Sequence, residues 1–179
     1  MSYRRIVTGH DSSGQSVFLR DETAPRTRDF QHVPGFMTSL LWETSPDAVI
    51  PVMSGDPAVV ARSWVPGPGG TNLMFITFPP DSVMMGPDFD PMAAGGEYMQ
   101  ELPGLAEKFE KESPGMHTTD TVDYAVLLDG ELALELDNGA VKQLARHDVV
   151  IQNGTRHAWR NLSERPATML FVLVGARRA

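Results

Sequence analysis

The hydrophobic and polar positions between residues 114 and 161 predict several short strands joined by tight turns. Residues 123–128 (DYAVLL) are mostly apolar, and residues 131–136 (ELALEL) alternate strictly between polar and apolar side chains. Asp129 and Gly130 separate these two runs, and an Asp-Gly pair favours a primed hairpin turn because glycine tolerates the positive φ that such a turn needs. We therefore expect the two runs to pair as an antiparallel hairpin.

Similar runs recur elsewhere in the chain. A second turn, Asp137-Asn138-Gly139, is expected to return the chain along residues 140–144. Apolar runs bounded by turn residues predict further strands at residues 4–8, 16–20, 36–43, 71–78, 148–152 and 167–174. Many short strands at this spacing predict an all-β, antiparallel structure.

One long segment, residues 79–113, interrupts the strand pattern. It is rich in methionine, and residues 105–111 (LAEKFEK) favour a short helix. Loops of this length in compact domains often act as lids or binding elements, and methionine side chains suit adaptable apolar surfaces. We expect this insert either to cover a binding site or to pack against the other strands or a second subunit.

The segment that leads into the predicted hairpin resembles the first motif of the cupin family. That motif runs G, five residues, H-x-H, three or four residues, E, six residues, G. Anchored on Gly130, it places its two histidine positions at His117 and Thr119 and its carboxylate position at Asp123. Threonine and aspartate thus stand where the family usually has histidine and glutamate.

The second cupin motif runs G, five residues, P-x-G, two residues, H, three residues, N. Anchored on Gly154, it places its histidine at His157 and its asparagine at Asn161, with Gln152 at the usual proline position. The resemblance covers residues 116–174 and implies a cupin double-stranded β-helix, or jelly-roll barrel, with an N-terminal β extension and a partly helical insert. It also implies a homodimer, because cupins commonly pair through their terminal strands.

On this basis we expect a single domain over residues 1–179. It divides into N-terminal strands (1–78), the insert (79–113) and a motif core (114–174).

Strand alternation indicates which side chains share one face. If His117 points inward, Thr119 and Asp123 do so as well, provided that the segment stays extended. By the same alternation, the side chains of Trp159 and Asn161 point inward if that of His157 does. We therefore predict that His117, Asp123 and His157 are the catalytic residues and line one cavity, with a substrate pocket formed by Thr119, Trp159 and Asn161.

Two imidazoles and one carboxylate are the donor set of a facial triad, which leaves positions open on a first-row divalent metal. The resemblance therefore implies a metal site at His117, Asp123 and His157, for which Fe(II), Mn(II), Ni(II) or Zn(II) is chemically admissible. Asp123 is one methylene shorter than the usual glutamate, so a metal-free site is the alternative.

Composition narrows the classes of partner. The 179 residues include 23 Asp and Glu against 15 Lys and Arg, a net charge of −8, and no basic block, which argues against nucleic acid and anionic membranes as partners. The absence of cysteine excludes disulfides, thiolate metal sites and a cysteine nucleophile. No apolar run has signal-peptide character or reaches the roughly 20 residues that span a bilayer, so a cytoplasmic location is expected.

Three functions are consistent with these residues and a small-molecule substrate. The first is an enzyme of dehydratase or isomerase type, in which a histidine abstracts a proton next to a carbonyl group. The second is a non-haem Fe(II) dioxygenase that uses the same three residues to hold the metal. The third is a barrel that binds a small ligand without catalysis.

Overall fold

The computed structural model describes residues 2–50 and 55–179, and most of their regular secondary structure is β-strand. The strands are β1 (Arg4–His10), β2 (Ser16–Thr23), β3 (Arg26–Asp29), β4 (Met37–Thr44), β5 (Thr71–Phe78), β6 (Thr121–Asp129), β7 (Leu132–Glu135), β8 (Val141–Leu144), β9 (Val149–Asn153), β10 (Ala158–Arg160) and β11 (Ala167–Gly175). The helices are α1 (Pro57–Val60) and α2 (Pro91–Glu101), with 3-10 turns η1 (Asp81–Met85), η2 (Ala106–Lys108) and η3 (Asp137–Gly139). The expected all-β class is confirmed.

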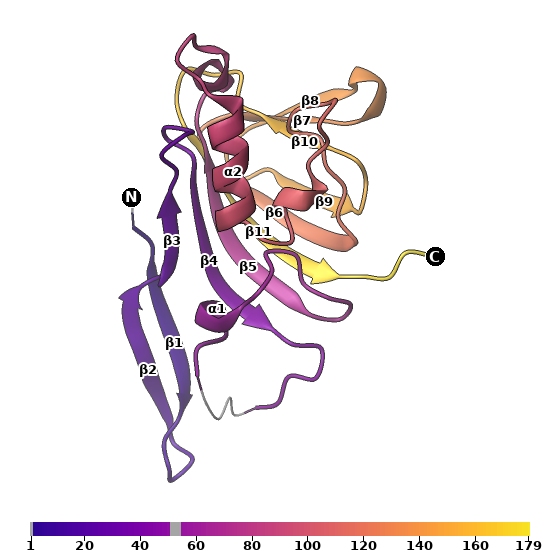
Figure 1. Ribbon diagram of the computed structural model, residues 1–179. Coiled ribbons are helices and arrows are strands. Elements are labelled where there is room, and N and C mark those ends of the chain that lie inside the picture. The colour runs from indigo at the N-terminus through magenta and orange to yellow at the C-terminus, as the bar shows by residue number, and fades with distance from the viewer. Residues whose placement is uncertain (1, 51–54) are drawn as a thin grey trace.

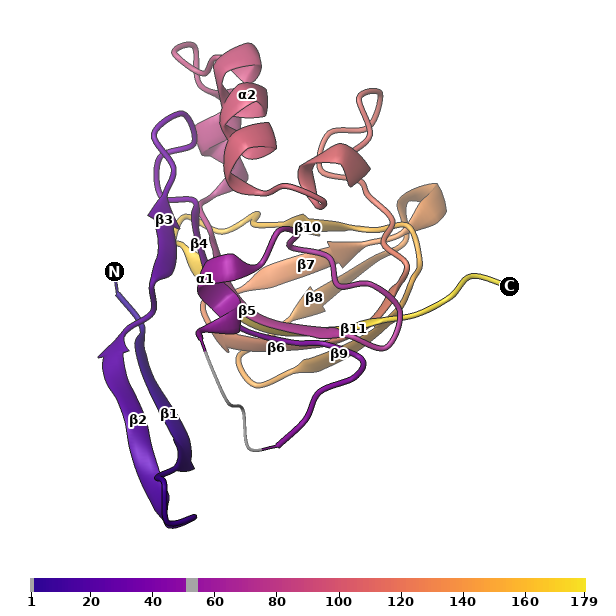
Figure 2. The ribbon, with the colours of Figure 1, turned by 60° about the horizontal axis from the view of Figure 1, so that its bottom comes forward.

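Two sheets enclose the core. The larger has the strand order β3-β4-β5-β11-β6-β9, and the smaller has the order β10-β7-β8. Figure 2 shows the small sheet facing the β5-β11-β6-β9 part of the large one, as in a barrel. Strand β11 shows why these residues form a central strand: Ala167, Met169, Phe171 and Leu173 alternate with less buried residues and point into the core.

The first predicted hairpin is wrong, because its two strands belong to different sheets. Strand β6 pairs with β9 and β11, whereas β7 pairs with β8 and β10. Gly130 has a φ of +81°, and a Cβ at this position would lie 2.7 Å from the carbonyl oxygen of Pro166. The Asp129-Gly130 turn is therefore a crowded corner that carries the chain from one sheet to the other. The second predicted hairpin, between β7 and β8, is confirmed.

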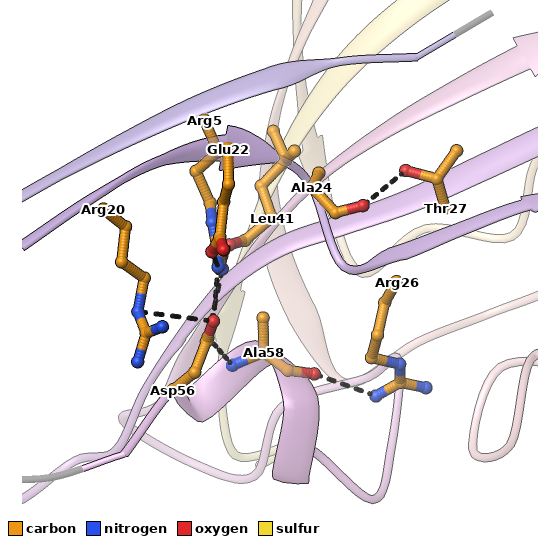
Figure 3. Close-up of polar contacts among 9 residues, drawn as sticks. All are labelled: Arg5, Arg20, Glu22, Ala24, Arg26, Thr27, Leu41, Asp56 and Ala58. Atoms are coloured by element: carbon orange, nitrogen blue, oxygen red, sulfur yellow. Dashed lines mark hydrogen bonds and ion pairs between the residues drawn. The ribbon is translucent and has the colours of Figure 1, made fainter.

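Strands β1 and β2 form a separate two-stranded sheet. Figure 1 shows this hairpin extending away from the barrel beside the N-terminus. It is attached by Arg5, whose guanidinium hydrogen-bonds both carboxylate oxygens of Asp56 and the carbonyl oxygen of Leu41 (Figure 3). Asp56 in turn caps α1 by accepting a hydrogen bond from the backbone N–H of Ala58 at 3.1 Å.

The insert is helical, but not where the sequence pattern placed the helix. Helix α2 begins after Asp90, whose side chain accepts hydrogen bonds from two backbone N–H groups of the first turn, and Pro91 occupies the first helical position. Residues 105–111 contain only the short turn η2. Gly95 and Gly96 inside α2 lower its intrinsic helix propensity, which explains why the residue pattern did not reveal it.

The insert covers one end of the barrel. Figure 2 shows α2 and the segment that follows it lying beyond the β10 edge of the small sheet. Ala94, Leu102, Leu105 and Ala106 are buried in the same core cluster as β5, β6 and β11 side chains. Among the described residues, no helix is long and apolar enough to cross a membrane.

Candidate functional site

His117 and His157 are held side by side by hydrogen bonds between their own backbones. The N–H of His117 donates to the carbonyl oxygen of His157 at 2.9 Å, and the N–H of His157 donates back to His117 at 3.0 Å. The two ring centroids are 4.2 Å apart, with the planes inclined at 49°. Both residues are buried, at 8% and 2% exposure. The two cupin motifs are therefore brought together as the sequence predicts.

The backbone also determines the tautomer of each ring. Nδ1 of His117 lies 3.0 Å from the carbonyl oxygen of Gly115, and Nδ1 of His157 lies 2.9 Å from that of Thr155. A carbonyl oxygen only accepts hydrogen bonds, so each Nδ1 carries the proton and donates it. In a neutral imidazole the lone pair is then on Nε2. Both rings thus present a basic nitrogen that no described hydrogen bond occupies.

Burial keeps both rings neutral. It lowers the pKa of His157 to about 4, and the neighbouring His117 lowers the pKa of His157 further, while the Thr155 carbonyl opposes the shift. Burial likewise lowers the pKa of His117, against the opposing influence of the Gly115 carbonyl and the charge of Glu110. At neutral pH both imidazoles are therefore neutral, and the lone pair of each Nε2 is unprotonated.

Asp123 lies on β6 and points inward, as predicted. Burial raises the pKa of its carboxyl group to about 6, and a hydrogen bond from Thr121 opposes the shift. The Oδ1 atom of Asp123 is buried without a hydrogen-bond partner. Gln152 stands directly opposite on β9, and its buried Nε2 also lacks a partner. The motif comparison marked Gln152 only as a departure from proline, so its place beside Asp123 is a finding of the structure.

The predicted three-residue metal centre is not formed. Two imidazole nitrogens suit a first-row divalent ion. Within residues 2–50 and 55–179, however, no three His, Asp or Glu side chains lie close enough together to hold one. Asp123 therefore does not join His117 and His157 as a third ligand, which agrees with the shorter reach of aspartate. The described residues do not fit a three-residue metal site, and the chemistry proposed for them uses the imidazoles alone.

The three predicted pocket residues differ in their surroundings. Thr119 is buried, and its hydroxyl lies 2.7 Å from that of Thr121. Trp159 flanks the histidines, with its ring centroid 5.6 Å from that of His157. The Asn161 amide donates to the carbonyl oxygens of Phe78 and Arg165.

Asn161 also accepts two hydrogen bonds from Ser163. Its hydrogen-bonding capacity is therefore used by the surrounding loops, and Asn161 has a structural role instead of the predicted contact with substrate.

The insert contributes a residue that sequence reasoning missed. The Phe109 ring lies 4.8 Å from His117, and the two residues form an isolated antiparallel bridge. The only signal in the sequence was an aromatic residue a few positions before the first motif. The insert therefore reaches the histidine pair directly.

Two hollows on the surface are lined by neither His117 nor His157. One of about 350 Å³ is lined by loop residues that include Pro34, Phe89 and Asp90, and one of about 220 Å³ is lined by residues that include Arg156 and Arg160. The charged side chains in the larger hollow, Asp88 and Asp90, are exposed, whereas the imidazoles are buried and neutral. We therefore place the candidate active site at His117 and His157.

The chain is similar to proteins named for biosynthesis clusters, although no family model matches it. It is 33% identical over 177 residues to phomopsin biosynthesis cluster protein C′ of Diaporthe leptostromiformis, covering 97% of this chain and 78% of that protein. It is 28% identical over 174 residues to the cupin-domain-containing oxidoreductase fogC of Aspergillus ruber, covering 95% and 71%. A solved cupin 2 conserved barrel domain protein from Salinispora arenicola has a TM-score of 0.40 at 14% identity, over 83% of this chain and 87% of that one.

These alignments with curated relatives extend over nearly the whole chain and not only over the motif core. Together with the two facing sheets and the paired motif histidines, they confirm the expectation drawn from the motifs. The chain belongs to the cupin superfamily.

Proposed function

We propose that this cupin is an enzyme that moves a proton next to the carbonyl group of a small molecule, as a dehydratase or an isomerase does. The observation that carries the proposal is the histidine pair, in which both Nδ1–H groups are bound to backbone carbonyls and both Nε2 lone pairs remain free. The similarity to a biosynthesis cluster protein supports a small-molecule substrate.

The chemistry follows from the two free nitrogens. Nε2 of one histidine accepts a proton from the carbon next to the carbonyl group, and the electron pair of the broken C–H bond moves to form an enolate. The resulting imidazolium then returns the proton. Return to a different carbon completes an isomerisation, whereas transfer to a departing hydroxyl group releases water and completes a dehydration. The second imidazole, 4.2 Å away, serves as the partner base or acid.

An oxygen-dependent oxidoreductase is the second candidate. The similarity to a cupin-domain-containing oxidoreductase favours an oxidoreductase, and the use of oxygen is part of this second proposal. The two candidates differ in whether oxygen is consumed and in whether a chelator abolishes turnover.

Deuterium exchange tests the proposal without knowledge of the natural substrate. Acetophenone and cyclohexyl methyl ketone both carry exchangeable hydrogens next to a carbonyl group, and proton NMR in D2O follows their loss. We expect the protein to accelerate the exchange of at least one of the two ketones. His117→Gln and His157→Gln each remove the basic nitrogen and are expected to lower the accelerated rate by about 100-fold or more.

His10→Gln is the matched control, because His10 is an exposed histidine on β1, outside the pair. It is expected to leave the exchange rate unchanged, and circular dichroism checks that each variant is folded. EDTA is expected to have no effect. Equal exchange in wild type, His157→Gln and buffer would refute the proposal, and EDTA-sensitive oxygen uptake would favour the oxidoreductase.

A further inference from the structure

Eight ring side chains form a closed circuit that passes through the histidine pair. Neighbouring ring centroids along it are between 4.2 and 6.5 Å apart. In order, the circuit runs through His117, His157, Trp159, Phe171, Phe78, Phe36, Tyr98 and Phe109, and from Phe109 back to His117.

The circuit is assembled from segments that are far apart in the sequence. Trp159 comes from β10 in the small sheet, and Phe171 and Phe78 come from adjacent strands of the large sheet. Tyr98 and Phe109 come from the insert. The circuit therefore crosses from one sheet to the other and is completed by the insert that covers this end of the barrel (Figure 2).

Aromatic side chains such as Trp64 and Phe30 are also buried outside the circuit, but the circuit is the set of rings that includes the histidine pair. Away from the circuit, the largest fully buried apolar side chains of the barrel strands are aliphatic or methionine: Leu40, Met74, Leu127, Leu132 and Met169. A barrel core that only had to exclude water needs apolar volume and no particular ring geometry. Aromatic rings arranged edge to face or tilted also offer a specific surface to another flat ring.

A second feature points to a ligand with a polar group. Asp123 stands opposite Leu173 on β11, two positions from Phe171 on the same inward face. The buried Oδ1 of Asp123 and Nε2 of Gln152 have no hydrogen-bond partner. A buried polar atom without a partner is costly, so a ligand that brings a polar group to this place is favoured.

We infer that the ligand is a planar aromatic carbonyl compound, whose ring packs against the aromatic circuit and whose carbonyl group lies beside the histidine pair. This inference deepens the proposed function by naming its substrate class and rests on it. Tyr98 and Phe109 belong to the insert, so the insert forms part of the recognition surface. Phe109 packs directly against the buried His117, so this ring has to shift when a ligand reaches that imidazole.

Two ketones of similar size separate aromatic recognition from apolar burial. Acetophenone and cyclohexyl methyl ketone share the acetyl group, but only the first has a flat aromatic ring, and the saturated ring is fully apolar. Titration calorimetry, or ligand-observed NMR for weak binding, gives the Kd of each. We expect the Kd of acetophenone to be about two- to tenfold lower, the range that aromatic pairs contribute beyond apolar burial.

Two phenylalanines on neighbouring strands provide matched variants. Phe171→Leu removes a ring of the circuit, and Phe75→Leu makes the same change on β5, where Phe75 instead packs with Tyr3 at 4.4 Å. We expect Phe171→Leu to abolish the preference for acetophenone and Phe75→Leu to retain it. If Phe171→Leu does not fold, Phe109→Leu in the insert is the variant to test instead. The comparison of the two ketones on the wild-type protein requires no variant.

The possible outcomes separate this inference from the proposed function. Equal Kd values for the two ketones, no binding of either, or an equal loss of preference in Phe75→Leu and Phe171→Leu would overturn the inference. Tight, ring-dependent binding of acetophenone without deuterium exchange would support the aromatic ligand class and refute the proton-transfer function. Histidine-dependent deuterium exchange without a preference for acetophenone would support the proton-transfer function and refute the aromatic ligand class.

Discussion

Removal of the Asp56 carboxylate is expected to loosen the attachment of the β1-β2 hairpin. The Arg5 and Asp56 side chains are only 6% and 8% exposed, and both carboxylate oxygens of Asp56 accept hydrogen bonds from the guanidinium group (Figure 3). Arg20 lies 3.8 Å from the same carboxylate. Asp56→Ala therefore leaves Arg5 as a buried charge without its main partner.

The size of the expected loss in unfolding free energy depends on the hydrogen-bond partners that Arg5 keeps. Breaking a buried ion pair from one side costs about 3–5 kcal/mol. In Asp56→Ala, Arg5 keeps the carbonyl oxygen of Leu41 and the carboxylate of Glu22, whose side chain is 39% exposed. This places the loss at about 2–3 kcal/mol, and loss of the α1 cap adds roughly 1 kcal/mol. We expect a total loss of about 3–4 kcal/mol, or roughly 6–16 °C in Tm.

Urea unfolding followed by circular dichroism measures this loss. Asp21→Ala is the matched control, because Asp21 pairs with Arg4 on the same hairpin in an exposed ion pair at 2.6 Å. It is expected to leave the free energy of unfolding close to that of the wild type. A loss below about 1 kcal/mol in Asp56→Ala would refute the reasoning, since it would mean that water reaches Arg5. Replacing both charges, as Arg5→Met with Asp56→Leu, is expected to cost less than Asp56→Ala alone.

The contribution of the Arg5–Asp56 pair to the free energy of unfolding is expected to depend on pH. Burial acts to raise the pKa of Asp56, but the hydrogen bonds and charge of Arg5 outweigh it, so the pKa lies below its ordinary value. A carboxylate with a lowered folded pKa stabilises the fold above its unfolded pKa of about 3.9 and loses this contribution as pH falls through the folded value. The difference in unfolding free energy between wild type and Asp56→Asn is therefore expected to narrow below about pH 4. A constant difference from pH 7 to pH 3 would contradict this assignment.

Three further substitutions test the fold and the site. Gly130→Ala is expected to lower the free energy of unfolding in urea by about 2 kcal/mol or more, and Gly139→Ala by only about 1 kcal/mol. Both glycines have positive φ, but a Cβ would meet backbone atoms only at Gly130. Equal losses in the two variants would contradict the crowded corner. Asn161→Ala is expected to lower stability by about 2–4 kcal/mol and leave the Kd of acetophenone unchanged, whereas a weakened Kd would restore its predicted pocket role. Gln152→Leu is expected to leave the stability of the ligand-free chain equal or higher, since its Nε2 has no partner. A large loss of stability would show that this amide is satisfied.

Local pattern was sufficient for most strands. The bounds of β5 agree with the predicted residues 71–78, because the strand lies between a glycine-rich turn and Pro79-Pro80. The motif spacing also identified His117 and His157 as partners although 40 residues separate them. That prediction came from the resemblance to a family and not from periodicity, since alternation along one strand carries no information about the strand that faces it.

The tertiary structure decided how those elements meet. The Asp-Gly turn after β6 specifies a reversal of direction but not a partner, and long-range packing places β7 in the other sheet. Helix α2 has weak intrinsic propensity and is stabilised by burial of Ala94 and its neighbours in the core. Side chains from several segments form the aromatic circuit. They also determine that Asp123 does not lie with His117 and His157 as a metal ligand. The sequence by itself determines which face of a strand is apolar, whereas the contacts across that face exist only once the sheets and the insert have packed together.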